Sequence, residues 1–173
     1  MSENEINEIP AEVFKLKRLK VLDLEKNLIE TLPEVTVTID MSTMMTSISP
    51  LEELYLSYNK IASIPGSLFQ LSTLKVLWAS NNKLSEIPVG IGALTSLEDL
   101  DLERNRLAGS IPNSIFNLSK LRTLYLHDNK FTGQLAPSMT RLSQLEILDL
   151  DSNSLSGTVS PRLGLFPRLT QLQ

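Results

Sequence analysis

The feature that most constrains this chain is a spaced set of leucines followed by one asparagine, which recurs along almost the whole sequence. In the segment LEELYLSYNKIASIP these positions are Leu51, Leu54, Leu56 and Asn59. Six complete copies begin at Leu19, Leu51, Leu74, Leu97, Leu121 and Leu145, with partial copies at both ends of the chain. Their first leucines are 32, 23, 23, 24 and 24 residues apart. Self-similarity at this period predicts a stack of repeats rather than one compact core.

The spacing within each copy predicts a short strand that must stack on its neighbours. Alternating leucines such as Leu54 and Leu56 share one face of a strand. One repeat alone buries too few aliphatic side chains to offset the conformational entropy lost on ordering its backbone, so it needs adjacent repeats to fold. Consecutive strands then pair in parallel, and a return segment such as GSLFQLST must connect them on the far side.

An asparagine stands where each copy turns out of its strand. These residues are Asn27, Asn59, Asn82, Asn105, Asn129 and Asn153. A buried amide has both donors and an acceptor, so we expect it to bond the backbone of its own turn and of the next one. Because the position is repeated, we interpret the column as structural rather than as a set of ligand contacts.

These motifs resemble the leucine-rich-repeat family, over nearly the whole chain apart from residues 34–50. The resemblance implies an α/β-type solenoid. In this family a right-handed superhelix carries a parallel β-sheet on its concave face and an irregular or short-helical convex side. We therefore expect residues 1–173 to form a single leucine-rich-repeat domain.

The copies are of two types. The early links, NKIASIP and NKLSEIP, resemble the repeats of cytoplasmic Ras-signalling scaffolds. The later links, NRLAGSIP, NKFTGQLAP and NSLSGTVSP, contain an extra glycine and resemble the plant-specific subclass of receptor-like kinases and receptor-like proteins. Gly109, Gly133 and Gly157 form a column where we expect a positive φ or a close backbone approach. The last link departs from the pattern, with Val159-Ser160-Pro161 in place of Ile-Pro.

Residues 34–50, EVTVTIDMSTMMTSISP, interrupt the period. Val35, Val37 and Ile39 alternate like a strand, and we interpret the segment as a surface insertion on the return side. An excursion that reaches toward a partner and a mis-joined sequence are the alternatives. Both ends of the chain fall inside a repeat without a polar capping unit. We therefore expect an excerpt of a longer solenoid that self-associates through its uncapped ends.

The composition argues against several classes of partner. A net charge of -4 and a pI near 5.1 disfavour binding to nucleic acid or an anionic membrane surface. The chain has no cysteine and no apolar run near the ~20 residues that span a bilayer. The N-terminus lacks the basic and apolar regions of a secretory signal. As written, the chain is expected to be cytoplasmic; the alternative is the extracellular side of the plasma membrane, if it is an excerpt of a receptor.

The sequence offers no constellation for catalysis, so we expect neither enzyme activity nor a metal or cofactor. A catalytic site needs a nucleophile or metal with a positioned base, whereas His127 is the only histidine and the seven glycines are scattered at repeat positions. We interpret Asp149 and Asp151 as solvated residues of the strand face. The glycosylation sequon Asn117-Leu118-Ser119 on the return side is weak support for secretion, because three-residue matches arise by chance.

The strand residues that point away from the core should line the concave face. Four such positions in each complete copy give 24 residues, with nine carboxylates against Lys26 and Arg104, a net charge of about -7. The only tryptophan and all three tyrosines also fall on this face, and aromatic residues are enriched at binding hot spots. Tyrosine also suits a strand surface, which is the structural alternative. We predict a partner-binding surface made of Tyr55, Tyr58, Trp78, Asp99, Asp101, Glu103, Tyr125, His127, Asp149 and Asp151.

Three functional hypotheses follow from the resemblance and the face. The first is a non-catalytic module that binds a protein or peptide, basic ligands included, within a soluble signalling scaffold. The alternative is a fragment of the ligand-binding extracellular domain of a receptor-like kinase or receptor-like protein. The third is the substrate-recruiting arm of an enzyme whose catalytic domain is absent.

Overall fold

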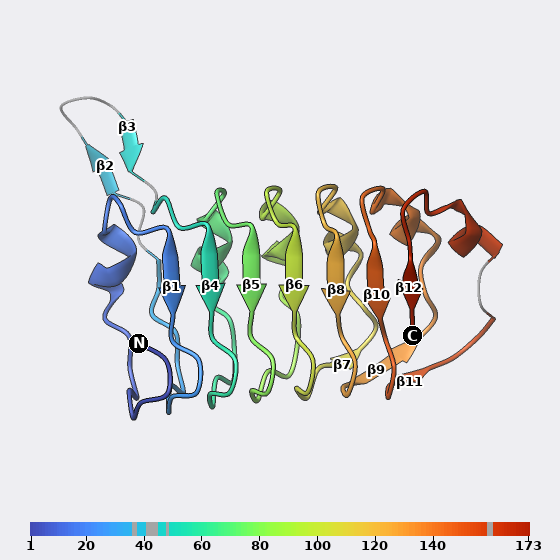
Figure 1. Ribbon diagram of the computed structural model, residues 1–173, viewed down its shortest axis with the longest axis horizontal. Coiled ribbons are helices and arrows are strands. Elements are labelled where there is room, and N and C mark those ends of the chain that lie inside the picture. Colours follow the sequence, from blue (N-terminus) through green and yellow to red (C-terminus); the bar gives the residue numbers. More distant parts are fainter. Residues whose placement is uncertain (36–37, 41–44, 48, 159–160) are drawn as a thin grey trace.

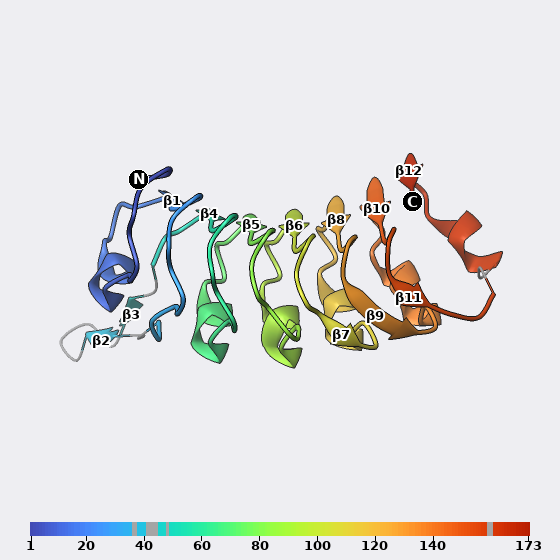
Figure 2. The same cartoon turned by 90° about the horizontal axis from the view of Figure 1, so that it is seen from below.

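The computed structural model describes residues 1–173 except 36–37, 41–44, 48 and 159–160. Successive turns of the chain lie side by side along one axis (Figure 1). The largest set of strands lines one side of this stack and the short helices lie on the other, and the side with the large set of strands is concave (Figure 2). The predicted solenoid with a parallel sheet and a short-helical convex side is therefore confirmed.

The concave side is one seven-stranded parallel sheet in the order β1-β4-β5-β6-β8-β10-β12. Its strands are β1 (Val21–Asp23), β4 (Glu53–Tyr55), β5 (Val76–Trp78), β6 (Asp99–Asp101), β8 (Thr123–Tyr125), β10 (Ile147–Asp149) and β12 (Gln171–Leu172). Neighbouring strands pair without slippage, so that Leu54 opposes Leu77 and Leu77 opposes Leu100. Equal positions of the repeats therefore form straight rows across the sheet.

The leucine rows form the core because alternate strand residues point to opposite faces. Leu54, Leu77 and Leu100 are fully buried, while the residues beside them in each strand are partly exposed. Leu68 and Leu71 of one return segment are also fully buried and close the core from the convex side. One continuous apolar cluster thus runs along the stack instead of filling a compact globule.

The return segments contain five-residue 3-10 helices. These are η1 (Ala11–Lys15), η2 (Gly66–Gln70), η3 (Val89–Ala93), η4 (Asn113–Asn117), η5 (Pro137–Arg141) and η6 (Pro161–Leu165). The proline of the Ile-Pro pattern stands just before η2, η3 and η4, in an extended conformation with φ between -61° and -67°. The ring of proline holds φ near this value, so each proline favours the same entry angle into the helix.

A second, smaller parallel sheet accompanies the glycine-bearing links. It consists of β7 (Ala108–Gly109), β9 (Lys130–Gly133) and β11 (Ser154–Leu155). Gly109, Gly133 and Gly157 have φ values of 78°, 81° and 86°, which confirms the predicted positive φ. A side chain is strained in this region of φ, so only glycine adopts it at low cost. The two types of link in the sequence therefore differ in structure.

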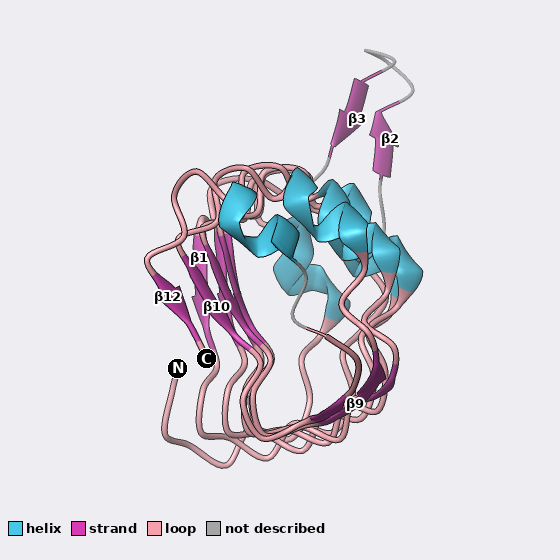
Figure 3. Cartoon of the chain, turned by 90° about the vertical axis from the view of Figure 1, so that its right-hand side faces the viewer, coloured by secondary structure: helices cyan, strands magenta, loops and turns pink. Residues whose placement is uncertain are grey.

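Part of the interrupting segment forms an antiparallel hairpin of β2 (Thr38–Asp40) and β3 (Met45–Ser47). The hairpin projects away from the stack and from the large sheet (Figure 1, Figure 3). Val35 is buried and donates its N–H to Ser67 Oγ at 2.8 Å. Val37 of the predicted alternation lies outside the described residues.

The buried asparagines tie each turn to the one before it. Asn82 donates from Nδ2 to the carbonyls of Ala79 and Ser80 in its own turn, and to that of Leu56 in the preceding turn. Its Oδ1 accepts the N–H of Ile61, also in the preceding turn, at 2.9 Å. The predicted link to the next turn was wrong in direction, because the amide reaches back along the stack. All six asparagines accept such a backbone N–H from the preceding turn.

Replacing Asn82 with alanine should destabilise the chain by about 2–4 kcal/mol, because buried backbone groups then lose their partners. The free energy of unfolding can be measured by urea titration followed by circular dichroism. Lys83→Ala is the control, since this neighbouring side chain is exposed and its backbone bond to Ile61 remains. Equal stability of the two variants would contradict the structural role of the column.

Candidate functional site

The concave face presents one continuous central row of side chains. Tyr55 pairs with Trp78, Trp78 with Asp101, and Asp101 with Tyr125. Asp23 extends the row at one end and Asp149 at the other. Strands in a sheet are about 4.8 Å apart, so neighbours in this row can touch. The in-register pairing therefore brings together the aromatic and acidic residues that the sequence places one repeat apart.

Tyr55 and Trp78 form an aromatic pair at the centre of the first half of the face. Their ring centroids are 5.0 Å apart, with the planes at 77° in an edge-to-face arrangement. Both side chains are partly exposed. The Tyr55 hydroxyl donates to Glu53 Oε2 at 2.7 Å, and burial, followed by this contact, raises the pKa of Tyr55 to about 12. The pair is thus held in a defined geometry while leaving ring surface open to a ligand.

Tyr58 does not join this aromatic pair. It lies in the turn after β4 with φ of 58°, and half of its surface is exposed. Among the described residues its ring makes no contact with Tyr55 or Trp78 of the kind that joins those two. The equivalent residue also has a positive φ in the other complete repeats, so this position belongs to the turn after the strand and not to the central row.

The aspartates of the central row also stabilise the backbone, which was not predicted from the sequence. Asp23, Asp101 and Asp149 each accept the backbone N–H of the residue two positions later, at 3.0–3.1 Å. Such side-chain bonds stabilise the turn out of the strand. The interpretation of Asp149 as a solvated residue was wrong, since only 6% of its surface is exposed, whereas Asp151 is exposed.

The only histidine lies between two carboxylates. His127 Nε2 is 2.7 Å from Glu103 Oε2, and Nδ1 is 3.1 Å from Asp149 Oδ2. The Nδ1 contact is short, but its direction does not satisfy a hydrogen bond. Tyr125 approaches the imidazole edge-on, with centroids 6.4 Å apart. The structure therefore unites Glu103, Tyr125, His127 and Asp149 in one cluster at the far end of the face.

Partial burial perturbs the acidic residues between the aromatic pair and this cluster. Burial raises the pKa of Asp101 to about 6, and the nearby Glu103 and Asp99 carboxylates add to the effect. Burial also raises the pKa of Asp99. The charge of the face is therefore sensitive to pH near 6, which the simple count of carboxylates did not reveal.

A row of alternating charges along the edge of the face was also missed. It consists of Lys20, Glu52, Lys75, Glu98, Arg122 and Glu146, each directly after the first leucine of a repeat. Glu52 lies 2.6 Å from Lys20 and 2.7 Å from Lys75, and these two ammonium groups lower its pKa to about 2. The alternation of sign at one repeat position was the available signal.

This charged row borders a shallow pocket of about 320 Å³ on the concave face. Three neighbouring strands line it with equivalent residues, which are Val76 of β5, Asp99 of β6 and Thr123 of β8. Glu53, Glu98 and Glu146 add three further carboxylates, and Lys75 and Arg122 add two cations. The pocket lies directly beside the central row, because Asp99 belongs to the same strand as Asp101.

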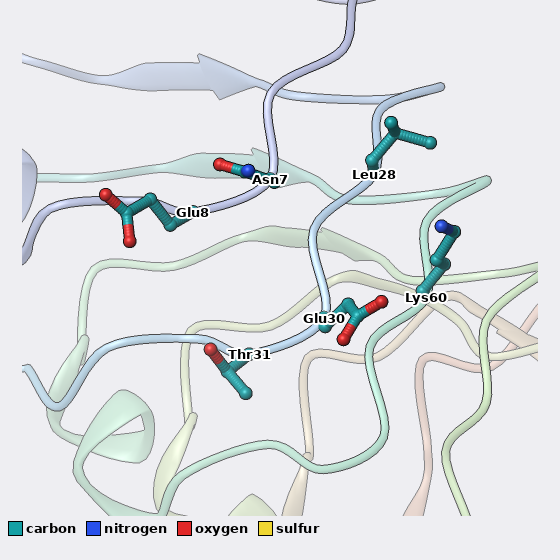
Figure 4. Close-up of a pocket in the computed structure, with 6 residues that line it drawn as sticks. All are labelled: Asn7, Glu8, Leu28, Glu30, Thr31 and Lys60. Carbon is teal, nitrogen blue, oxygen red and sulfur yellow. The ribbon is translucent and has the colours of Figure 1, made fainter.

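A second pocket, of about 590 Å³, lies away from this face, where the first turns of the chain leave the asparagine positions. Figure 4 shows the six residues that line it, which come from three successive turns. It combines Lys60 with Glu8 and Glu30 and contains no aromatic side chain. The concave face offers a ligand more kinds of contact than this second pocket, because it carries aromatic rings as well as charged groups.

Within the described part of the chain, no group of three histidine, cysteine, aspartate or glutamate side chains is arranged to hold a metal ion. The same part contains no helix that is both long and apolar enough to cross a membrane.

Asp101→Asn should stabilise the chain at pH 7 and not at pH 4. Folding raises the pKa of Asp101 from an ordinary value of 3.8 to about 6, so the native state holds this proton more tightly than the unfolded state. The contribution of Asp101 to stability is therefore most favourable below about pH 4 and is lost as pH rises through 6. The neutral amide can still accept the Glu103 N–H, and we expect a gain of about 1–2 kcal/mol at pH 7.

Urea unfolding at both pH values measures this difference. Glu86→Gln is the matched control, because it removes one exposed carboxylate outside the concave face. A gain for Asp101→Asn that is equal at pH 4 and pH 7 would contradict the assigned protonation.

Comparison with known proteins supports the same architecture. A model of the leucine-rich repeat region matches residues 65–173, and a leucine-rich repeat model matches residues 50–71. No curated protein sequence was found to match the chain significantly. The early repeats are not assigned to the Ras-signalling type by these matches, so that resemblance stays a prediction.

Several solved structures share the fold. A TDR receptor is 32% identical with a TM-score of 0.81, covering 96% of this chain and 28% of its own. PEPR1 with AtPEP1 is 31% identical with a TM-score of 0.80, covering 95% and 22%. The Arabidopsis receptor kinase HAESA, in complex with the peptide hormone IDA and the co-receptor SERK1, is 26% identical with a TM-score of 0.73, covering 99% and 33%.

This chain therefore spans a third or less of the length of these three receptor chains. The family model covers more than half of the chain, and the leucine rows, the parallel sheet and the asparagine column agree with it. The chain belongs to the leucine-rich-repeat family.

Proposed function

We propose that this chain is part of a receptor-type leucine-rich-repeat domain that binds a peptide or protein segment on its concave face. The observation that carries the proposal is the Tyr55–Trp78 pair. It lies partly exposed on a sheet whose core is already filled by leucines. Large aromatic side chains that are held rigid bind a partner at a low entropic cost, which makes them frequent hot spots.

The similar structures support the receptor hypothesis more than the cytoplasmic scaffold. HAESA is described in complex with a peptide hormone, and PEPR1 in complex with AtPEP1. The glycine-bearing links and their second sheet agree with the plant-type resemblance. We accordingly propose a place on the extracellular side of the plasma membrane and a binding role without catalysis.

The proposed contact surface comprises the predicted residues that share the concave face. Tyr55 and Trp78 would provide the apolar anchor, and Asp99 and Asp101 the charged contacts beside it. The cluster around His127 would form a second contact area, two strands away from Trp78 in the sheet. The remaining members, Tyr58 and Asp151, are exposed at the turn side of the face and would contribute to its rim.

Self-association through the end of the stack is a competing mode of interaction. An apolar pocket of about 300 Å³ at the first turn includes Ile6, Ile9 and Leu22. Leu16, which also lines it, is half exposed. Burial of such a surface against a second copy would be favourable. Light scattering of the chain should therefore accompany every binding measurement.

The concave-face proposal can be tested with a displayed library of random dodecapeptides selected on the unmodified chain. Trp78→Ala should weaken binding of the selected peptides by roughly tenfold or more, mainly through faster dissociation, because desolvated aromatic anchors slow the release of a partner. Surface plasmon resonance measures both rates. Asp101→Lys should act mostly on the association rate of basic peptides and lose this effect at high salt.

Gln70→Arg is the control for the convex side, because Gln70 is an exposed residue of η2. Peptides that bind Trp78→Ala and Asp101→Lys normally but no longer bind Gln70→Arg would place recognition on the convex surface. That result would overturn the proposed site.

A further inference from the structure

We infer that the pocket beside Trp78 binds the guanidinium group of an arginine side chain, presented by the peptide or protein segment that the concave face recognises. This inference rests on the proposed function and names the chemistry of one subsite. It depends on three features: carboxylates of the pocket that take part in no ion pair among the described residues, a buried Asp99 oxygen that accepts no hydrogen bond, and the aromatic pair next to Asp99.

The carboxylates of the pocket outnumber the cations that could neutralise them. Lys75 is engaged by Glu52 at 2.7 Å, and Arg122 by Glu146 at 2.8 Å. Among the described residues neither Glu98 nor Asp99 takes part in an ion pair, although both line the pocket. The pocket therefore keeps negative charge that a cationic ligand group can compensate.

Asp99 lies at the centre of this arrangement. Its Oδ1 atom is buried and makes no hydrogen bond. A buried carboxylate oxygen without a donor is costly, and burial accordingly raises the pKa of Asp99. The donor groups of the Trp78 and Thr123 side chains interact with the carboxylate and lower its pKa again in part. A ligand that donates hydrogen bonds to Asp99 would therefore relieve a cost that the free protein carries.

The Trp78 indole lies next to the Asp99 carboxylate. Its buried Nε1–H does not meet full hydrogen-bond geometry but still lowers the pKa of Asp99, and the ring itself is partly exposed. Tyr55 packs edge-to-face against this ring and limits its movement. A flat cation can stack on the exposed ring surface while its donors reach Asp99, which combines a cation–π contact with a charge-assisted hydrogen bond.

These features favour a guanidinium over other cations. Arginine is planar, donates in a fixed fork that matches a carboxylate, and is less strongly hydrated than an ammonium group. The apolar surface of Val76 and the Thr123 side chain beside Asp99 suit the aliphatic stem of the same residue. A bound metal ion fits less well, since no metal-ligating group of three side chains occurs in the described ranges.

Titration of the ¹⁵N-labelled chain with N-acetyl-arginine amide tests this subsite directly. Trp78 is the only tryptophan, so the protein has a single indole N–H signal. We expect that signal to shift and saturate at millimolar probe, and N-acetyl-citrulline amide, a neutral analogue of the same shape, to bind roughly tenfold more weakly or not at all. Equal binding of arginine and citrulline probes, or no shift with either, would overturn the inference.

Asp99→Asn should weaken binding of the arginine probe by about tenfold, because the amide keeps the shape and loses the charge. Glu86→Gln removes a carboxylate outside the face and should leave the affinity unchanged. Dispersed backbone signals confirm that Asp99→Asn is folded. If N-acetyl-lysine amide binds as tightly as the arginine probe, the preference for guanidinium is wrong.

The selected dodecapeptides separate this inference from the proposed function. One outcome is that the selected peptides depend on Trp78 but contain no arginine, and that the arginine probe does not shift the indole signal. This outcome would support binding on the concave face and refute the arginine subsite. The opposite outcome is that the peptides bind Trp78→Ala and Asp101→Lys normally, while the arginine probe still shifts the indole signal. This outcome would refute the proposed function and support only the arginine subsite. Enrichment of arginine that disappears when selection is repeated on Asp99→Asn is the expected result.

Discussion

The buried or partly buried asparagine amide at each turn connects neighbouring repeats, and the rest of the structure depends on this link. A chain that leaves a strand must expose backbone carbonyls and N–H groups, and burying them without partners is costly. Asn82 bonds three carbonyls and one N–H, and two of these four groups belong to the preceding turn. The same amide therefore closes its own turn and fixes its spacing from the neighbour. Register across the large sheet follows from this repeated link.

Regular register turns equivalent positions of the sequence into rows on the surface. The inward position of each strand from β1 to β10 in the large sheet is a leucine, so the core places little demand on what the outward positions carry. Tyr55 and Trp78 can consequently meet as a pair, although 23 residues separate them in the chain. The outward positions are not entirely free, because Asp23, Asp101 and Asp149 also accept a turn N–H. Binding surface and turn stability thus share residues on this face.

Electrostatics divides the face into compensated and uncompensated parts. At its edge, alternating lysine or arginine and glutamate residues pair along the stack, as Glu52 does with both Lys20 and Lys75. One strand position further, Asp99 has carboxylates and aromatic rings as neighbours and no cation paired with it among the described residues. Partial burial strengthens its interactions because less water screens them. A ligand cation could compensate the charge of Asp99, which links the proposed binding role to one place on the face.

The sequence by itself determined the fold, the rows and the candidate face, because the spacing of leucines, asparagine and glycine reports directly on strand alternation, buried turns and positive φ. It could not determine which atoms meet between repeats. Backbone geometry at the strand ends decides the backward direction of the Asn82 bonds, the burial of Asp149 and the place of Tyr58 in the turn. The pocket around Asp99 likewise requires the rotamers of side chains from neighbouring strands. Only the tertiary structure decided these contacts, because they arise between residues of neighbouring repeats, 21 and 26 positions apart for the Asn82 bonds, whose distance is set by stacking and not by local sequence.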